Sequence, residues 1–221
     1  MLDKITNLDD LWAYCDELHA QFYPDDSLLP IMGNGKTLNP EYMFVFINPT
    51  YRNVTSSKEW GGFRAPWIGT KYIWKIFNRA GHFDAELLDE IQNKKEWDTP
   101  FGEKVYKHLA DRGFYFTNLV KWTGENADLP NKEKINTFLP LLRHEIGLVR
   151  PKKIVTFGLM PFEALTGEKL KLGDYYNDLL ESGVPTTYDV EFGGHKTEVI
   201  PCYFPVGRGD PKRAVEILKL I

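Results

Sequence analysis

The sequence has 221 residues, of which 43% are hydrophobic and 26% are charged, as is usual for a folded globular protein. A chain of this length can bury a full core, so we expect a single α/β domain over residues 1–221. No window approaches the ~18 apolar residues of a membrane span, and no N-terminal signal peptide is visible. With Cys15 and Cys202 as its only cysteines, the sequence predicts a cytoplasmic protein without an iron-sulfur cluster or structural zinc.

Charge is distributed unevenly along the chain. The net charge of −4 argues against indiscriminate binding to nucleic acid. Residues 50–75 nevertheless carry five cations against Glu59 alone, whereas residues 81–98 are strongly acidic. A protein with one basic face can meet a polyanion in one orientation, although such blocks are also typical of solvated surfaces.

Hydrophobic spacing and breaker residues predict alternating helices and strands. We expect Asn7, Thr99 and Asp210 to cap helices, and Pro140 to kink or split the helix that contains it. Because strands alternate with helices, the fold class is α/β, a three-layer α/β/α domain with a central, mostly parallel four-stranded sheet. The expected helices cover 7–22, 70–81, 84–92, 99–112, 131–150 and the end of the chain from 210; the expected core strands cover 43–47, 113–117, 153–157 and 197–202, with 188–192 paired to the last as a hairpin.

Two of these buried strands end in an asparagine. Asn48 follows the first strand and Asn118 follows the second. In open α/β sheets ligands bind at the carboxyl ends of strands, so both amides are candidates for chemistry. The long loop 48–69 between the first strand and the next helix has a length that is usually functional. An Asn-Pro pair also ends strands that have no function, and that interpretation stays open for Asn48.

Familiar catalytic motifs are missing from the sequence. It has no glycine-rich phosphate loop with its lysine, no spacing typical of metal ligands and no recognisable Ser-His-acid or Cys-His set, so we expect neither cofactor nor metal. The strand ends instead offer asparagine amides, which donate and accept hydrogen bonds, together with the aromatic residues Phe63 and Trp67. This combination suits a nucleobase extruded from DNA, which is read along its edge and stacked on its face.

An ordered series of motifs extends from about Gly33 to the C-terminus: Ile31-Met-Gly-Asn-Gly35, Ile47-Asn48-Pro49, Pro66-Trp67-Ile68-Gly69, Tyr115-Phe-Thr-Asn118-Leu-Val-Lys121 and Ile200-Pro-Cys-Tyr-Phe-Pro205. As a series, rather than one by one, these motifs resemble those of the uracil-DNA glycosylase superfamily. Residues 31–35 leading into the first strand resemble families 4 and 5, and Ile47-Asn48-Pro49 resembles the Gly-x-Asn-Pro-Gly motif of the mismatch-specific and single-strand-selective families. Pro66-Trp67-Ile68-Gly69 is similar to Pro-Phe-Val-Gly, Tyr115-Phe-Thr-Asn118-Leu-Val-Lys121 to Tyr-Ile-Thr-Asn-Val-Val-Lys, and residues 200–205 occupy the position of a Thr-Tyr-His-Pro-Ser turn.

The resemblance implies roles for the residues of the base pocket. Asn48 would position the water that attacks the sugar, and Asn118 would read the edge of the base. Trp67 takes the place of a phenylalanine that stacks on the flipped base. Thr50, with the main chain after Asn48, and Phe204 would complete the base-binding site.

The resemblance also implies a surface that contacts DNA. The turn 204–209 would enter the minor groove, with Arg208 filling the gap in the base stack and Gly207 beside it. Lys121 and Arg64 are further candidates for contacts with DNA. The partner is then DNA that contains a damaged base, bound by a monomer without metal, and affinity should fall steeply with salt.

Two departures from the family pattern bear on the substrate. Thr50 replaces the usual glycine, and Phe204 stands where most families have a histidine that stabilises the departing uracil anion. We therefore expect a monofunctional DNA glycosylase of base-excision repair, with uracil as the leading substrate and hypoxanthine or xanthine as the alternative. A catalytically weak nucleic-acid binding protein on the same fold, or a hydrolase of free nucleosides, is the remaining possibility.

Overall fold

The structure is a computed structural model that describes residues 2–126, 128–207 and 209–221. Its centre is a β-sheet in which neighbouring strands lie in the order β1-β3-β2-β4-β6-β5. The four inner strands are parallel, and both edge strands are antiparallel to their neighbours. The strands are β1 (Asn34–Gly35), β2 (Tyr42–Phe46), β3 (Phe114–Asn118), β4 (Lys153–Phe157), β5 (Tyr188–Phe192) and β6 (His195–Cys202).

The parallel core of four strands is confirmed, but the sheet has six strands rather than four. β1 has only two residues, which is too short to leave a hydrophobic pattern in the sequence. β5 pairs with β6 through a turn at Gly193 and Gly194, whose φ angles of 56° and 73° favour glycine. This hairpin lies at the edge of the same sheet and extends it.

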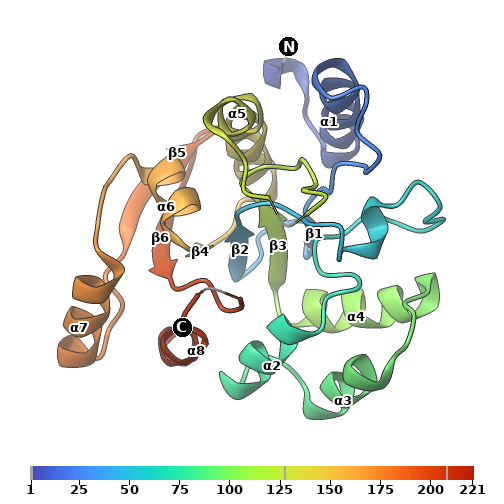
Figure 1. Cartoon of the computed structure of the whole chain (residues 1–221). Coiled ribbons are helices and arrows are strands. Elements are labelled where there is room, and N and C mark those ends of the chain that lie inside the picture. The colour runs from blue at the N-terminus through green and yellow to red at the C-terminus, as the bar shows by residue number, and fades with distance from the viewer. Residues whose placement is uncertain (1, 127, 208) are drawn as a thin grey trace.

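Helices cover both faces of the sheet and produce the predicted three layers. In Figure 1, α1 and α5 lie above the sheet, and α2, α4 and α8 lie below it. One buried cluster centres on Phe44 and Phe116, and the other on Val45 and Tyr115, which face the opposite side. The helices are α1 (Leu8–Phe22), α2 (Tyr72–Arg79), α3 (Ala85–Asn93), α4 (Thr99–Asp111), α5 (Lys132–Val149), α6 (Leu159–Thr166), α7 (Leu172–Ser182) and α8 (Pro211–Leu218), with short 3₁₀ turns at Leu2–Lys4 and Val54–Ser56.

The helix caps agree with the sequence in two of three cases. Asn7 and Asp210 cap α1 and α8, as predicted. The cap of α4 is Asp98 rather than Thr99, because the Asp98 carboxylate accepts a hydrogen bond from the Phe101 N–H at 2.9 Å.

Of the kink or split expected at Pro140, the split is wrong, because α5 runs through this residue without interruption. A proline inside a helix costs about 3 kcal/mol. Phe138, Leu141 and Leu142 on either side are at most 1% exposed, and burying each of them contributes about 1.5–3 kcal/mol. Packing of α5 onto the sheet therefore outweighs the loss of one backbone hydrogen bond. α6 and α7 were not predicted.

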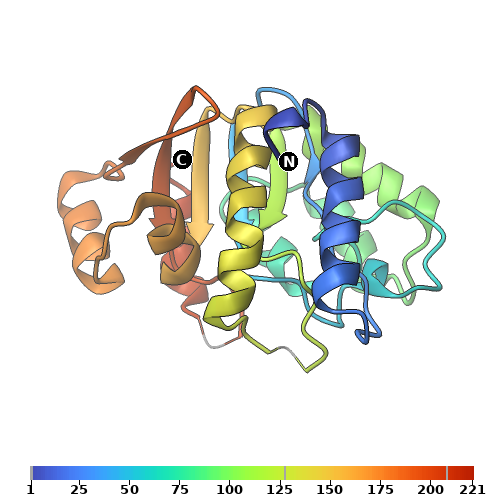
Figure 2. The same ribbon diagram turned by 90° about the horizontal axis from the view of Figure 1, so that it is seen from above.

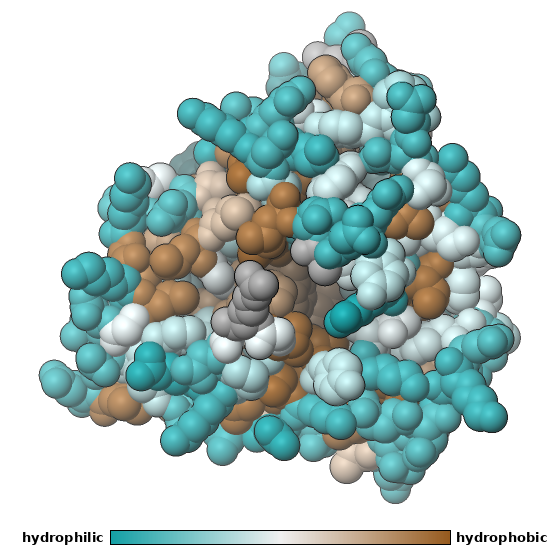
Figure 3. Space-filling model, in the orientation of Figure 1, coloured by the Kyte–Doolittle hydropathy of each residue, from teal (hydrophilic) through white to brown (hydrophobic). Residues whose placement is uncertain are grey.

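The parallel arrangement gathers the carboxyl ends of β2, β3, β4 and β6 at one edge of the sheet. Figure 2 shows the strands pointing toward this edge, and Figure 1 looks directly onto it. In Figure 3, which has the orientation of Figure 1, the surface is hollowed near the centre of this face, and hydrophobic residues lie above and below the hollow. The loops that follow the inner strands therefore surround a concave site.

Candidate active site

Asn48 is held at the carboxyl end of β2 by its own side-chain amide. Its Nδ2 donates to the carbonyl oxygens of Pro49 at 2.9 Å and Asp128 at 3.0 Å. Two acceptors around one terminal atom identify that atom as the nitrogen. Among the described residues, Asn48 Oδ1 receives no hydrogen bond, so it is the half of the amide that can accept one from a water molecule.

The loops after β2 and β3 pair with each other beside Asn48. Val120 donates its N–H to the Ile47 carbonyl at 3.0 Å, and the N–H groups of Tyr51 and Gly124 donate to the carbonyls of Gly124 and Pro49, each at 3.0 Å. Gly124 has no room for a side chain, since a Cβ there would lie 2.8 Å from the Asp128 carbonyl oxygen. These contacts fix the backbone around Asn48 and Thr50, which is half-buried and bridges to Gly124.

Asn118 ends β3 and is 2% exposed. Its Nδ2 is buried and has no hydrogen-bond partner in the part of the chain that the structure describes. A buried polar group left without a partner costs about 1–3 kcal/mol, so such a group calls for a reason. A ligand with an acceptor atom at this position would satisfy it.

Aromatic rings lie beside Asn118 on the same face of the sheet. Phe46 is its register partner on β2, and residues paired in this way project to the same side. The half-buried Phe46 ring packs against Phe157 at 4.6 Å between centroids and meets the Phe204 ring edge-on at 6.3 Å. The strand ends thus present an amide next to a partly exposed hydrophobic wall.

Lys121 does not contact DNA in the way the sequence suggested, because it is fully buried. Its ammonium group pairs with Glu145 of α5 at 2.6 Å and donates to the Asn118 carbonyl at 2.9 Å and to the Thr117 hydroxyl. Glu145 is also fully buried and accepts a hydrogen bond from the Tyr115 hydroxyl at 2.9 Å. Lys121 is therefore a structural support beneath the strand end that carries Asn118.

Trp67 lies in the core and is 2% exposed, packed near Phe63 and Trp97. A base cannot reach a face of this indole in the conformation described. The stacking role that the resemblance implies for Trp67 stays a prediction, and it requires a rearrangement of the loop 48–71. Phe46 and Phe204 are the rings that are already partly exposed.

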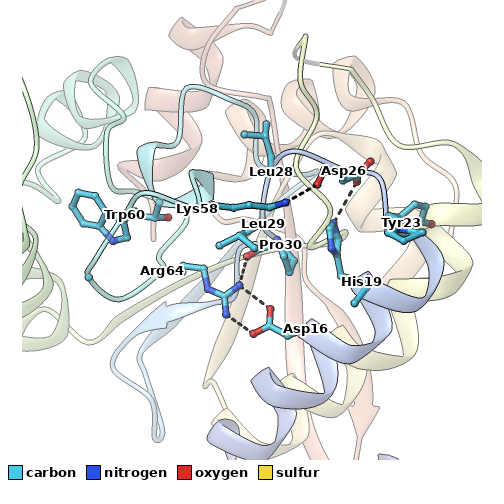
Figure 4. A pocket seen from close by; sticks show the side chains of 14 residues that line it. Asp16, His19, Tyr23, Asp26, Leu28, Leu29, Pro30, Lys58, Trp60 and Arg64 are labelled. Atoms are coloured by element: carbon cyan, nitrogen blue, oxygen red, sulfur yellow. Dashed lines mark hydrogen bonds and ion pairs between the residues drawn. The ribbon is translucent and has the colours of Figure 1, made fainter.

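Arg64 lies away from the strand ends and already has an ionic partner. Its guanidinium binds the Asp16 carboxylate with N···O distances of 2.7 and 2.5 Å and also donates to the Pro30 carbonyl. It lines a cleft of about 540 Å³ between α1 and the loop 48–71, in which it points toward Asp16 while Lys58 points toward Asp26 (Figure 4). A contact of Arg64 with DNA stays a prediction.

The turn after β6 brings Phe204 and Gly207 to the same edge as Asn48 and Asn118. Gly207 is exposed and has a φ of 64°, a conformation that favours glycine. Gly209 is packed so closely against the Phe204 carbonyl that a side chain there has no space. Arg208, the expected wedge into the base stack, lies outside the described residues.

Two contributors to this site escaped the sequence interpretation. Phe46 occupies the position of the first glycine in the Gly-x-Asn-Pro-Gly motif, so its bulk was visible in the sequence, but its register with Asn118 was not. Glu145 lay within an amphipathic helix pattern, and its charge on the buried face was the signal that could have identified it.

The comparisons with known proteins agree with this arrangement. A family model of the uracil DNA glycosylase superfamily matches residues 32–216. The chain belongs to the uracil-DNA glycosylase superfamily, as its motifs predict. The type-4 uracil-DNA glycosylase of Pyrobaculum aerophilum is 38% identical to it over 64 residues, which are 27% of this chain. The match spans 33% of the length of that relative.

The described residues contain no group of three or more His, Cys, Asp and Glu side chains that could hold a metal ion. No helix in the described ranges has the length and apolar character needed to cross a membrane.

Proposed function

We propose that the protein is a monofunctional DNA glycosylase that removes a deaminated base, with uracil as the leading substrate. The observation that carries this proposal is the pair of asparagines at neighbouring strand ends. Within the described part of the chain, Asn48 has an unused acceptor and Asn118 has an unused, buried donor. One can hold a water molecule while the other binds the base that leaves.

An amide side chain is not basic enough to remove a proton from water in the ground state. Asn48 Oδ1 therefore acts by position, holding the water against the face of the sugar as the glycosidic bond lengthens. The sugar becomes cation-like and the base departs as an anion, so the water attacks only after most of the bond has broken, and the proton that the water loses neutralises the base anion. This order of events suits a site whose nucleophile is oriented but not activated.

The departing base needs hydrogen-bond donors as negative charge develops on it. Asn118 Nδ2 is such a donor, and it is preorganised because Lys121 fixes the backbone carbonyl of the same residue. Phe204 supplies no donor where most families have a histidine. We therefore expect slower catalysis than in a site with both groups.

The amide of Asn118 favours bases that present an acceptor next to an N–H donor. Uracil has this pattern at O4 and N3–H, and hypoxanthine has it at O6 and N1–H. Phe46 and Phe204 offer the apolar face against which either ring can stack. The partial similarity to a type-4 uracil-DNA glycosylase supports uracil over hypoxanthine.

A panel of labelled oligonucleotides that contain uracil, hypoxanthine or xanthine tests this proposal. The wild-type protein should release free uracil and leave an abasic site without a covalent protein–DNA adduct. Asn118→Ala should slow release by about 10²–10³-fold, the usual effect of removing one such donor. Leu129→Ala, an exposed residue, is the control and should keep the wild-type rate.

Absence of release from every deaminated base would contradict a glycosylase. Tight binding to abasic DNA without any release would assign the chain to the alternative, a nucleic-acid binding protein in which Phe204 has replaced the catalytic histidine. The monomeric state and the cytoplasmic location of the protein remain predictions.

A further inference from the structure

Four residues next to the candidate site form a surface that the mechanism above does not use: Tyr51, Arg52, Tyr72 and Lys75, here called the tyrosine surface. Tyr51 is 51% exposed and Tyr72 is 69% exposed. Among the described residues, Tyr72 is the most exposed large hydrophobic side chain. Exposed aromatic rings that occur together, rather than singly, indicate a binding surface.

Each tyrosine is accompanied by a cation. The Arg52 guanidinium carbon lies 5.7 Å from the centroid of the Tyr51 ring, and the Lys75 ammonium lies 5.5 Å from that of Tyr72. Arg52 also donates to the Tyr51 hydroxyl at 3.4 Å. The pKa of Arg52 is raised, mainly by its hydrogen bond to the Tyr51 hydroxyl and to a smaller extent by Tyr72.

Among the described residues, Arg52 and Lys75 are the cations of the basic segment 50–75 that donate neither to a carboxylate nor to a main-chain carbonyl. The other three have found partners: Arg64 binds Asp16, Lys71 donates to the carbonyls of Gln92 and Lys94, and Lys58 donates to the Asp26 carbonyl. The basic character of the segment is thus concentrated beside the two exposed rings.

The tyrosine surface adjoins the strand ends. Tyr51 is three residues after Asn48, so their Cα atoms are at most about 11 Å apart. Both ribbon views place α2, which carries Tyr72 and Lys75, near the carboxyl end of β3 (Figures 1 and 2). Gly69 links the two parts, because a side chain there would lie 3.0 Å from the Arg52 carbonyl oxygen. A DNA strand whose base enters the candidate site can therefore reach this surface.

We propose that the tyrosine surface binds an unpaired nucleotide that flanks the target base, with the flanking base stacked on a tyrosine and its phosphate held by Arg52 or Lys75. Stacking on a protein ring requires a free base face, which a paired base inside a duplex does not offer. Two cations on a chain of net charge −4 bind duplex DNA weakly. The inference rests on the proposed function and adds a preference for single-stranded over duplex substrate.

Fluorescence anisotropy with an undamaged single-stranded oligonucleotide tests the surface without base excision. Tyr72→Ala and Tyr51→Ala should weaken binding by about 5- to 150-fold, the range measured for loss of one stacked base, whereas Tyr72→Phe should bind like the wild type. Arg52→Gln should lower the slope of log affinity against log salt by about 0.7. Two variants are the controls and should change neither value: Lys196→Gln, at the amino end of β6 and so away from the strand ends that form the site, and Tyr106→Ala on α4.

A second readout locates the nucleotide. The fluorescence of 2-aminopurine placed next to an abasic site should be quenched by the wild type and by Tyr72→Phe, but not by Tyr72→Ala with Tyr51→Ala. Unchanged binding and quenching in the alanine variants, with uracil release intact, would overturn the surface and leave the glycosylase proposal standing. Failure of the wild type to bind any DNA would overturn both, and self-association that Tyr72→Ala abolishes would assign the surface to a second copy of the chain.

Discussion

At the scale of single residues, the site depends on which half of each asparagine amide is already used. Among the residues that the structure describes, Asn48 donates to two carbonyls and its acceptor has no partner, whereas the buried donor of Asn118 has none. The sequence predicted both residues because each follows a buried strand. It did not predict their hydrogen bonds, since Asp128 approaches Asn48 from a loop 80 residues away. The same limit explains the error at Lys121, whose partner Glu145 lies on another element.

Breaking the buried ion pair tests this account of Lys121. Lys121→Met leaves Glu145 charged and buried without its partner, so it should lower the free energy of unfolding by about 3–5 kcal/mol. Urea unfolding measures this loss. Lys121→Met combined with Glu145→Gln should recover part of the stability, because it removes the uncompensated charge. A loss below about 1 kcal/mol for Lys121→Met, as expected for an exposed ion pair, would contradict the buried pair.

At the scale of elements, the loop 48–71 is braced rather than open. Asn53, which is 3% exposed, donates to the Ala65 carbonyl at 2.8 Å and accepts from the Thr55 hydroxyl at 2.6 Å. The Trp60 indole donates to the Phe63 carbonyl at 3.0 Å. The sequence predicted the extent of this loop from its glycines and prolines, and the inner strands from their apolar runs. Contacts across twelve residues, such as that of Asn53 with Ala65, leave no periodic signal.

Removal of the brace should loosen this loop. Asn53→Ala removes the hydrogen bonds of Asn53 to the Ala65 carbonyl and the Thr55 hydroxyl and leaves only the longer bonds between Thr55 and Ala65 at 3.3 Å, which should cost about 1–3 kcal/mol. Hydrogen exchange at residues 53–67 should become faster, while exchange in α5 stays slow. Asn93→Ala on α3 is the control, since that exposed amide bonds only within its own helix. Equal exchange rates in the two variants would argue against the brace.

At the scale of the whole molecule, charge and burial decide how stability depends on pH. Burial is the main cause that lowers the pKa values of His19 and His108. His19 also lies 3.3 Å from Asp26, which opposes the shift, although this contact lacks the geometry of a hydrogen bond. Both histidines therefore bind protons more readily in the unfolded chain. Their contribution to stability is complete above the unfolded pKa of about 6.5 and is lost as the pH falls below it.

The free energy of unfolding should consequently decrease between pH 7.5 and pH 5.0. The pKa of Asp84 is lowered mainly by backbone hydrogen bonds at the N-terminus of α3, and that of Asp98 mainly by its hydrogen bond with Lys94. Both carboxylates lose their contributions to stability only below about pH 4, so the change between pH 7.5 and pH 5.0 reports the histidines. Urea unfolding at the two pH values measures the change. His108→Gln should flatten the pH dependence, and an unchanged slope in this variant would exclude His108 as its source.

The role of Asn48 in holding the attacking water is tested by single-turnover release of uracil from DNA by Asn48→Ala. The variant should bind abasic DNA as tightly as the wild type but release uracil at least about 100-fold more slowly, because the water is no longer oriented. Uracil release by Asn48→Ala at the wild-type rate would contradict the account.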